Sequence, residues 1–490
     1  LAAATDPPTD PYLHSQILSA LAETYLMLKD AGNAERYALR ALDSDDLNAD
    51  AALILSQIAA EAGNLKDALH WNAEACEMLS EDDTGPASLI NRELAKAKVD
   101  RAKLLADTDI RSGLALCAEA LHIVLPDYPP SSPMANPAPG NIYPENTILE
   151  ALETKADLLW RLYLRERRPA LLALADSAAI LALNAHDTLS ALFGFESATL
   201  YSQEELRDLH ELSLKILYER ARLADYADTH IGDRIFRFME KSRAVLLRQK
   251  LACMYLLRTG GPENPHMLLE TSLREQISDL RTQLAQLEAE GLARQEAARP
   301  LKARLFRLED QRNQLLRDLA KRRSNTLSPL DMALNEAPKS LLRRIDPHDE
   351  THLVAYFYNA QSGDLYLYAL GPDSWKIATA HLPYERIEDF LKIVKNGPLQ
   401  EARESDPAFL QDFATQSRAL YLRLLGPLFG DAPPARLLLL PDGSIGDLPF
   451  DLLLSETPAA PLDFRQAPYL LRQSVTRLAP SVSALLMPLP

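Results

Sequence analysis

Cysteine and glycine are scarce in this chain of 490 residues. The three cysteines, Cys76, Cys117 and Cys253, are odd in number and form no Cys-x-x-Cys pair. This spacing argues against a disulfide framework and against a zinc site, and it favours a reducing, cytoplasmic compartment. The 17 glycines fall mostly between segments. Because glycine costs about 1 kcal/mol in a helix interior, this distribution favours helices.

Long apolar runs and several well-known site motifs are also missing. No run of about 18 apolar residues is present, so we expect no membrane-spanning segment. The sequence contains no G-x-x-x-x-G-K-[ST] phosphate loop, no G-x-S-x-G elbow and no H-E-x-x-H motif. We therefore predict no cofactor and no metal ion. The chain begins at Leu1 and opens on helical sequence. We interpret it as a fragment open at both ends, which leaves room for an upstream signal peptide.

What the chain has in excess is negative charge. Its formal net charge is -17 and its isoelectric point is near 5.1. Such a surface repels phosphate backbones and anionic membranes, so we expect neither a nucleic acid nor a membrane as a direct partner. The hydrophobic content of 47% is ordinary for a globular protein. The length predicts about three or four domains.

The amino-terminal stretch repeats itself. Ala34 and Ala41 return as Ala68 and Ala75, each shifted by 34 residues, which is the period of the tetratricopeptide repeat (TPR). Small residues at these positions let paired helices approach closely, and one pair must stack on its neighbours to bury its apolar face. We predict TPR-like repeats over 1–125, with a third, degenerate unit at 89–125. A generic alanine-rich helix bundle is the alternative.

The next segments change character twice. Seven prolines between 126 and 144 predict an extended loop over 126–146, because proline blocks helix formation. Helical patterns at 147–167, 169–185, 203–226 and 233–247 predict further TPR-like pairs over 147–265. Leucines then recur in steps of three and four, which predicts an antiparallel coiled helical hairpin over 266–325, broken between Gly291 and Pro300. This hairpin is either a spacer, or a lever or dimer contact.

After Pro338 the hydrophobic period changes from 3.6 to 2. We expect strands at 351–358, 364–370, 375–381, 436–440 and 473–478. Helices are expected at 385–395 and 407–425, so the pattern predicts an α/β sheet. The fold class is thus a multidomain chain: an all-α superhelix, a helical hairpin and an incomplete α/β domain.

Two C-terminal runs carry a family resemblance. One is RLLLLPDG at 436–443, followed by LPF at 448–450, and the other is YLLRQSVTRLAPS at 469–481. Together with EKSRA at 240–244 and the order of the segments, they resemble bacterial TPR proteins that carry a C-terminal CHAT domain. CHAT domains are caspase-like, clan CD cysteine peptidase-like domains. The resemblance covers nearly the whole chain and implies that 340–490 is the N-terminal half of a CHAT domain.

The resemblance also implies a function. The chain would be the sensor region and first half of a caspase-like cysteine protease of bacterial signalling or defence. It would be inactive as supplied, because the catalytic His/Cys dyad lies downstream. A non-enzymatic TPR scaffold for protein–protein interaction is the alternative. We assign no catalytic residue, since Cys253 lies in an apolar helical stretch and no histidine stands in a His-Gly setting. The family motif residues are interpreted as structural: Pro441, Asp442, Gly443, Pro449 and Phe450.

The repeat frame also predicts a partner-binding surface on the first helix of each pair. Its positions are Gln16, Ser19, Glu23 and Met27 in repeat one, and Asp50, Leu53, Gln57 and Glu61 in repeat two. This acidic and apolar lining suits a basic or amphipathic protein segment. The alternative is that these are ordinary solvated positions, and the oligomeric state stays open.

Overall fold

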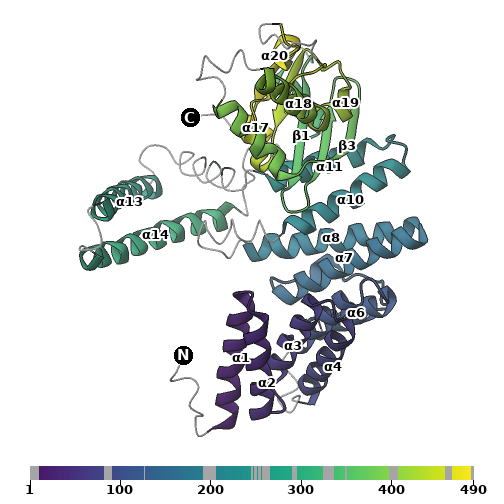
Figure 1. The fold of residues 1–490 in the computed structure, drawn as a ribbon, viewed down its shortest axis with the longest axis vertical. Coiled ribbons are helices and arrows are strands. Elements are labelled where there is room, and N and C mark those ends of the chain that lie inside the picture. Colours follow the sequence, from purple (N-terminus) through teal and green to yellow (C-terminus); the bar gives the residue numbers. More distant parts are fainter. Residues whose placement is uncertain are drawn as a thin grey trace. The chain divides into compact units, whose positions relative to one another are not determined.

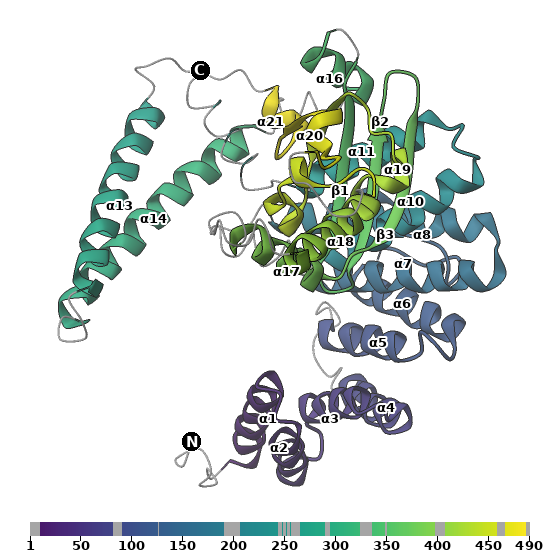
Figure 2. The ribbon, with the colours of Figure 1, turned by 45° about the horizontal axis from the view of Figure 1, so that its top comes forward.

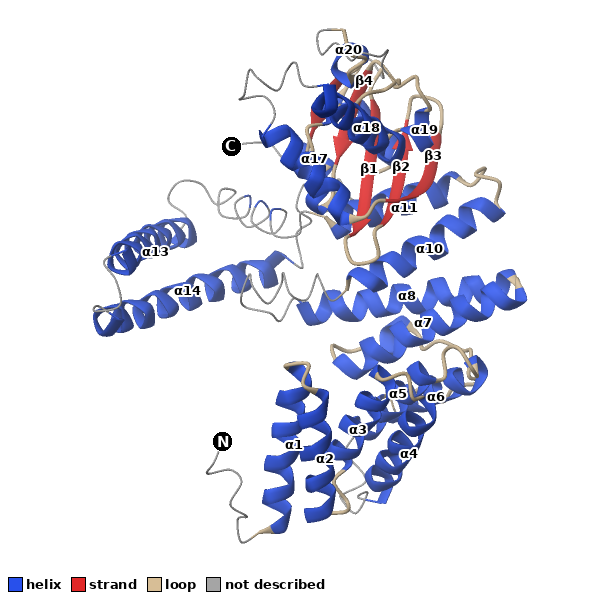
Figure 3. Ribbon diagram, in the orientation of Figure 1, coloured by secondary structure: helices blue, strands red, loops and turns tan. Residues whose placement is uncertain are grey.

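The computed structural model describes residues 10–81, 91–125, 127–190, 206–243, 265–289, 295–323, 336–347, 350–396, 407–457 and 466–486, with 247, 251 and 255. The described chain is mostly helical and has one small mixed sheet in its C-terminal part (Figures 1 and 3). It divides into two compact units, Leu1–Leu192 and Phe193–Pro490.

The first unit is built from helices that pair in sequence order. The pairs are α1 (Pro11–Met27) with α2 (Ala31–Ser44), α3 (Ala49–Glu61) with α4 (Leu65–Glu81), α5 (Arg92–Leu104) with α6 (Ile110–Val124), and α7 (Asn146–Glu166) with α8 (Pro169–Ser190). Contacts α2–α3, α4–α5 and α6–α7 join each pair to the next. Ala34, Ala41, Ala68 and Ala75 have no exposed surface, as expected where two helices approach closely.

Side-chain caps define where several of these helices begin. Asp30 accepts a hydrogen bond from Asn33 N (3.1 Å), and Asn48 accepts one from Ala51 N (2.9 Å). Asn48 also donates to Ser15 Oγ (2.6 Å), which donates in turn to Ala41 O (2.7 Å). The Asn48 side chain thus has two roles. It satisfies a free backbone N–H at the start of α3, and through Ser15 it connects α3 to α1 and α2.

The described part of the proline-rich segment, 127–145, is a loop with turns near Tyr128 and Ala135 and one short 3-10 helix, η2 (Pro139–Asn141). Tyr128 Oη donates to Ala135 O (2.5 Å), and the buried Lys155 amine donates to the same carbonyl. Asn136 Nδ2 donates to Leu174 O (2.9 Å). Burial lowers the pKa of Lys155 to about 8. The segment is thus held against α7 and α8 by buried polar groups.

Among the described helices, α8 contains a segment, Pro169–Leu189, that is long and apolar enough to span a membrane by composition, with a mean hydropathy of 1.3. Within the protein, 56% of that window is buried. Its partner is α7, and Leu171, Ala175, Ala178 and Ala182 lie in the core. A helix in the core of a protein can be as long and as apolar as a membrane-spanning helix, so composition does not distinguish the two.

The second unit contains a sheet of strand order β3-β2-β1-β4-β5. Its strands are β1 (His352–Asn359), β2 (Asp364–Leu370), β3 (Trp375–His381), β4 (Arg436–Leu440) and β5 (Val475–Leu478). The pairs β1–β2 and β2–β3 are antiparallel, whereas β1–β4 and β4–β5 are parallel. The expected strands are present, except that 473 belongs to the short helix α20 (Leu470–Gln473) and β5 begins two residues later.

Helices cover both faces of this sheet (Figures 1 and 2). One face, with Val354, Tyr356 and Tyr358, packs on α17 (Tyr384–Asn396), α18 (Pro407–Leu424), α19 (Gly426–Phe429) and the turns η4 (Gly443–Asp447) and η5 (Phe450–Leu452). The other face, with Leu353, Ala355 and Phe357, packs on α10 (Arg207–Leu223), α11 (Thr229–Ser242), α16 (Pro338–Ile345) and α21 (Val482–Leu485). The side chains of β1 therefore alternate between two apolar cores.

Helices α10 and α11 form part of the α/β domain, whereas we had grouped them with the repeat pairs. Ile235, Phe236 and Met239 of α11 are buried in the same core as Tyr368 and Leu438 of the sheet. The approach is so close at Gly232 that a Cβ placed there would lie 2.7 Å from the Trp375 indole. Helical periodicity shows that one face is apolar, but not what that face packs against.

Strand β5 is the outermost of the described strands on its side of the sheet. Val475 N donates to Ala435 O (2.8 Å) and Ala479 N to Leu439 O (3.0 Å). Because a strand directs alternate residues to opposite edges, the N–H and C=O groups of Thr476 and Leu478 face the outer edge. Val475 is 73% exposed and Leu478 is 50% exposed, so two of the four residues of β5 present apolar side chains to solvent.

The second unit also contains the expected helical hairpin, α13 (Pro265–Ala289) and α14 (Gln295–Arg323). Leu273 and Leu315 are buried between the two helices, and Arg312 Nη2 pairs with Glu270 Oε1 at 3.1 Å. Pro300 lies inside α14, so our prediction that the break extends to this proline was wrong. Pro300 is the sixth residue of α14, so its missing N–H removes one intrahelical hydrogen bond and the helix continues past it.

Candidate functional site at the carboxyl ends of the parallel strands

The three parallel strands β1, β4 and β5 end at one edge of the sheet. In open α/β sheets, ligands bind beyond the carboxyl ends of the strands. At this edge β1 ends at Asn359, and β4 leads into the Pro441-Asp442-Gly443 turn. Gly443 has a φ of +54°, a left-handed conformation that a residue with a Cβ rarely adopts. The motif turn therefore lies where a functional site is expected.

Strand β1 is longer than β4, and this difference in length creates the site. The parallel register ends with Ala355 opposite Leu440. Beyond that point the groups of β1 that face β4, Tyr356 O and Tyr358 N and O, have no strand to pair with. Since buried backbone groups must find partners, side chains take the place of the missing strand.

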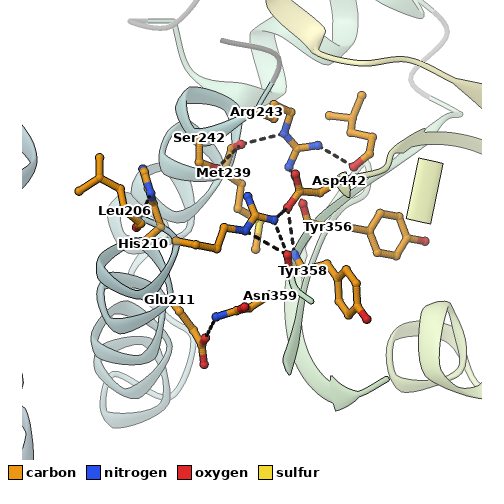
Figure 4. Close-up of polar contacts among 12 residues, drawn as sticks. Leu206, His210, Glu211, Met239, Ser242, Arg243, Tyr356, Tyr358, Asn359 and Asp442 are labelled. Carbon is orange, nitrogen blue, oxygen red and sulfur yellow. Dashed lines mark hydrogen bonds and ion pairs between the residues drawn. The ribbon is translucent and has the colours of Figure 1, made fainter. Parts of the chain in front are cut away.

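Asp442 and Arg207 satisfy the far end of β1. Asp442 Oδ2 accepts a hydrogen bond from Tyr358 N (2.9 Å) and also pairs with the guanidinium of Arg207 from α10. Arg207 Nε donates to Tyr358 O (3.1 Å), and its guanidinium carbon lies 4.2 Å from the centre of the Phe357 ring. Figure 4 shows Asp442 beside Tyr358. The motif aspartate thus joins the turn after β4 to β1 and α10.

Arg243, which directly follows α11, satisfies the next carbonyls. Its side chain is buried, and its guanidinium donates to Met239 O (2.7 Å), Leu440 O (2.6 Å) and Tyr356 O (2.9 Å) (Figure 4). Burial lowers the pKa of Arg243, and the carboxylates of Glu240 and Asp442 oppose that effect. The guanidinium remains a cation whose planar donors match three carbonyls at once.

Glu240 on the last turn of α11 reaches the segment after β5. Its side chain is 2% exposed. Oε1 accepts hydrogen bonds from Ser481 Oγ (2.7 Å), Ser483 N (2.8 Å) and Ser483 Oγ (2.8 Å), while Oε2 lies 4.0 Å from Arg243 Nε. Side chains from α10 and from the end of α11 therefore contact the carboxyl ends of all three parallel strands.

A second polar cluster lies at the turn between β1 and β2. Glu211 of α10 accepts a hydrogen bond from Asn359 Nδ2 (2.5 Å; Figure 4). It also pairs with Lys215 Nζ (2.7 Å). Burial raises the pKa of Glu211, but hydrogen bonds from Lys215, Asn359 and Asp364 outweigh burial and hold it below its usual value. Burial and the Glu211 carboxylate raise the pKa of Asp364. The pKa values of the two carboxyls are therefore displaced in opposite directions.

No residue among those described forms an activated thiol. Burial raises the pKa of Cys76, and raises that of Cys117 to about 12, so neither is a thiolate at neutral pH. Cys253 lies outside the described residues, as does His348. His381 Nδ1 lies 3.5 Å from Asp364 Oδ1. His352 lies at the opposite, amino end of β1, with its ring 6.0 Å from that of Phe429.

No group of three His, Cys, Asp or Glu side chains that could hold a metal ion occurs within the described parts of the chain. The charged groups at the carboxyl edge instead bond to one another and to the backbone. In chemical terms the arrangement sets the positions of strand ends and loops. It does not supply a nucleophile.

The predicted partner-binding residues lie on α1 and α3 and differ in exposure. Met27 is 79% exposed. The remaining exposed members are Glu23, Asp50, Gln57 and Glu61, and Gln16 and Leu53 are partly buried. Ser19 is only 4% exposed, so its inclusion was wrong: it lies on the same buried face of α1 as Ser15, Leu18 and Ala22.

The motif residues have identifiable contacts. Phe450 is 1% exposed, with its ring 5.9 Å from that of Tyr356, and Pro449 caps the turn η5. Sequence reasoning missed Arg207 and Glu211 altogether. It singled out the EKSRA run that contains Glu240 and Arg243, but assigned that run to a repeat helix. The available signal was the EKSRA run itself, at the end of the apolar stripe formed by Ile235, Phe236 and Met239.

Comparisons with known proteins add little. No family model matches the chain, and no curated protein matches it. Among solved structures, the chain is similar to a chain of the Saccharomyces cerevisiae separase–securin complex, with 12% sequence identity and a TM-score of 0.18. The match covers 86% of this chain and 38% of that one, so this chain spans well under half of the matched chain. A TM-score this low does not establish a common fold.

Proposed function

We propose that this chain is the partner-sensing region and first half of a caspase-like cysteine protease of bacterial signalling or defence. In this proposal the first unit is a TPR-like array and the sheet is the N-terminal half of a CHAT domain. The observation that carries it is the position of the Pro441-Asp442-Gly443 turn at the carboxyl edge of parallel strands, held there by Arg207 and Tyr358 N. That edge is where α/β enzymes bind substrates.

One further feature supports a sheet that continues beyond the described strands. None of the described strands pairs with the outer edge of β5, where the side chains of Val475 and Leu478 are exposed. Such an edge is suited to accept a further strand.

The proposed partner is a basic or amphipathic protein segment that binds α1 and α3. Residues 10–81 contain 13 acidic and 4 basic residues, a net charge of -9, and Met27 offers an exposed apolar contact among them. Opposite charges speed association and select against acidic partners. A protease whose sensor recognises such a segment would be activated by protein binding.

The test of this proposal starts with the gene. We expect the reading frame beyond Pro490 to encode a His-Gly and a later cysteine, and the full-length protein to cleave a protein substrate. Changing that cysteine to Ala should abolish cleavage and leave partner binding intact. Residues 1–490 alone should not turn over a peptide library. A downstream sequence without His and Cys, or turnover by the chain as given, would remove the proposal.

A non-enzymatic scaffold is the second candidate, favoured by the absence of an activated thiol from the described residues. In that case the full-length protein binds its partner but cleaves nothing, whatever the downstream sequence. A pull-down followed by mass spectrometry of the partner separates the two functions, because only a protease leaves new peptide termini.

A further inference from the structure

One turn of helix connects the ends of three strands that are distant in sequence. The last turn of α11 and the residue after it supply Glu240 and Arg243. Arg243 binds the backbone of β1 and β4, and Glu240 binds the segment that follows β5. These contacts join positions separated by 113 to 243 residues.

The groups in this network depend on one another electrostatically. Arg243 lies between two carboxylates, those of Glu240 and Asp442, and both counter its buried charge. Asp442 also pairs with Arg207. Removing one member of a buried charge network leaves the others uncompensated, so its effects are expected to spread beyond the altered side chain.

The geometry favours a positioning role over simple space filling. All three hydrogen bonds of the Arg243 guanidinium go to backbone carbonyls, and two of these belong to different strands. An apolar side chain of equal volume would fill the space without fixing the direction of either strand end. Lysine would offer a point charge in place of a planar fork.

We propose that Glu240 and Arg243 are positioning residues that couple the carboxyl ends of β1, β4 and β5, so that these ends shift together with the end of α11. This inference deepens the proposed function, because it rests on that function for the expectation that substrate binds at these strand ends. The coupling itself is a property of the described chain. In the protease, α11 then sets the geometry of the loops around the substrate.

Two backbone amides report on the two ends of the network. Tyr358 N–H is bonded to Asp442, and Ser483 N–H is bonded to Glu240. Hydrogen exchange of both amides should be followed in E240Q, D442N and R243K. We expect E240Q to lower protection at Tyr358, and D442N to lower it at Ser483, by about tenfold or more. Neither side chain has a hydrogen bond with the distant amide. R243K should lower both.

Controls separate coupling from general loosening. Protection of amides in the β2–β3 ladder, such as those of the pair Leu367 and Ala378, should be unchanged in all three variants. Glu388→Gln makes the same chemical change on the outer helix α17 and should alter neither reporter. If each substitution loosens only the amide to which its own side chain is bonded, the proposal is overturned.

A second measurement covers variants that lose overall stability. In chemical unfolding of E240Q, D442N and the double variant, coupled sites should change the unfolding constant non-additively, by about tenfold. An effect of the double variant equal to the product of the single effects would also overturn the proposal. In a full-length protein with protease activity, R243K should lower kcat/KM, because the loops around the substrate lose their fixed geometry. An inactive full-length protein would count against the proposed function alone, since the exchange and unfolding results do not depend on it.

Discussion

Arg243 Nη2 lies 2.9 Å from Tyr356 O, a carbonyl that faces the region beyond the end of β4. The arginine follows a helix that is more than a hundred residues away in sequence from this strand. Its side chain replaces the hydrogen bonds that a longer β4 would have made. The last turn of α11 is therefore a structural part of the sheet edge.

Arg207→Ala tests the ion pair at that edge. Its loss removes the cation that pairs directly with the Asp442 carboxylate, which is only 10% exposed. We expect the free energy of unfolding to fall by about 2–3 kcal/mol, because an unpaired buried charge is costly. Urea unfolding measures this. The exposed Arg386→Ala on α17 should change stability by less than about 0.5 kcal/mol, and an equal loss in both variants would contradict the assignment.

Lys155→Met tests the buried amine in the first unit. The folded pKa of Lys155 is about 8, below the ordinary value of 10.5, so the unfolded chain binds more protons between these pH values. The contribution of Lys155 to stability should therefore rise from pH 8 to 10.5, by on the order of 3 kcal/mol. Below pH 8 the destabilisation by the buried ammonium is fully present.

In Lys155→Met that rise should disappear, while Tyr128 Oη still donates to Ala135 O. The free energy of unfolding is measured by chemical unfolding at several pH values between 7 and 10. The matched control is Lys66→Met, at an exposed lysine, which should keep the wild-type pH dependence. Parallel pH profiles for wild type and Lys155→Met would show that the amine is not buried as described.

Gly232→Ala tests the close packing of α11 on the sheet. Alanine normally stabilises a helix interior by about 1 kcal/mol relative to glycine. Here its Cβ would lie 2.7 Å from Trp375, so we expect a net loss of about 1–3 kcal/mol from overpacking. Gly32→Ala in α2, whose nearest contact would be at 4.0 Å, should stabilise. Thermal unfolding compares the two, and a stabilising Gly232→Ala would refute the packing.

Val475→Lys with Leu478→Lys tests the open edge of β5. Apolar residues on an unpaired edge promote strand addition between molecules, and lysine blocks it. We expect the double variant to show lower light scattering on concentration, with little change in melting temperature, because both side chains are at least 50% exposed. Leu223→Lys and Leu422→Lys, on exposed helix positions, provide the comparison. If they reduce association equally, the edge has no special role.

Much of the secondary structure could be predicted because it depends on local pattern. Alternating residues at 364–370 and the apolar run at 436–440 are strands, and the alanines at steps of 34 residues lie buried between helices. The placement of α10 and α11 could not be predicted, since an apolar stripe packs equally well on a helix or on a sheet. The prediction that Ser19 binds a partner was wrong for a related reason. A repeat pattern predicts on which face of its helix a residue lies, but the neighbouring helices decide whether that face is exposed.

By itself, the sequence determined the type and order of the elements: paired helices, a hairpin and an α/β sheet. Hydrophobic periodicity and turn residues are local features, so a helix, strand or turn can be predicted from its own short segment of sequence. Only the tertiary structure decided that Arg207, Glu240 and Arg243 meet Asp442 and the ends of three strands. Those contacts arise because β4 is shorter than β1, and unsatisfied buried carbonyls accept whichever donors the packed helices bring within reach.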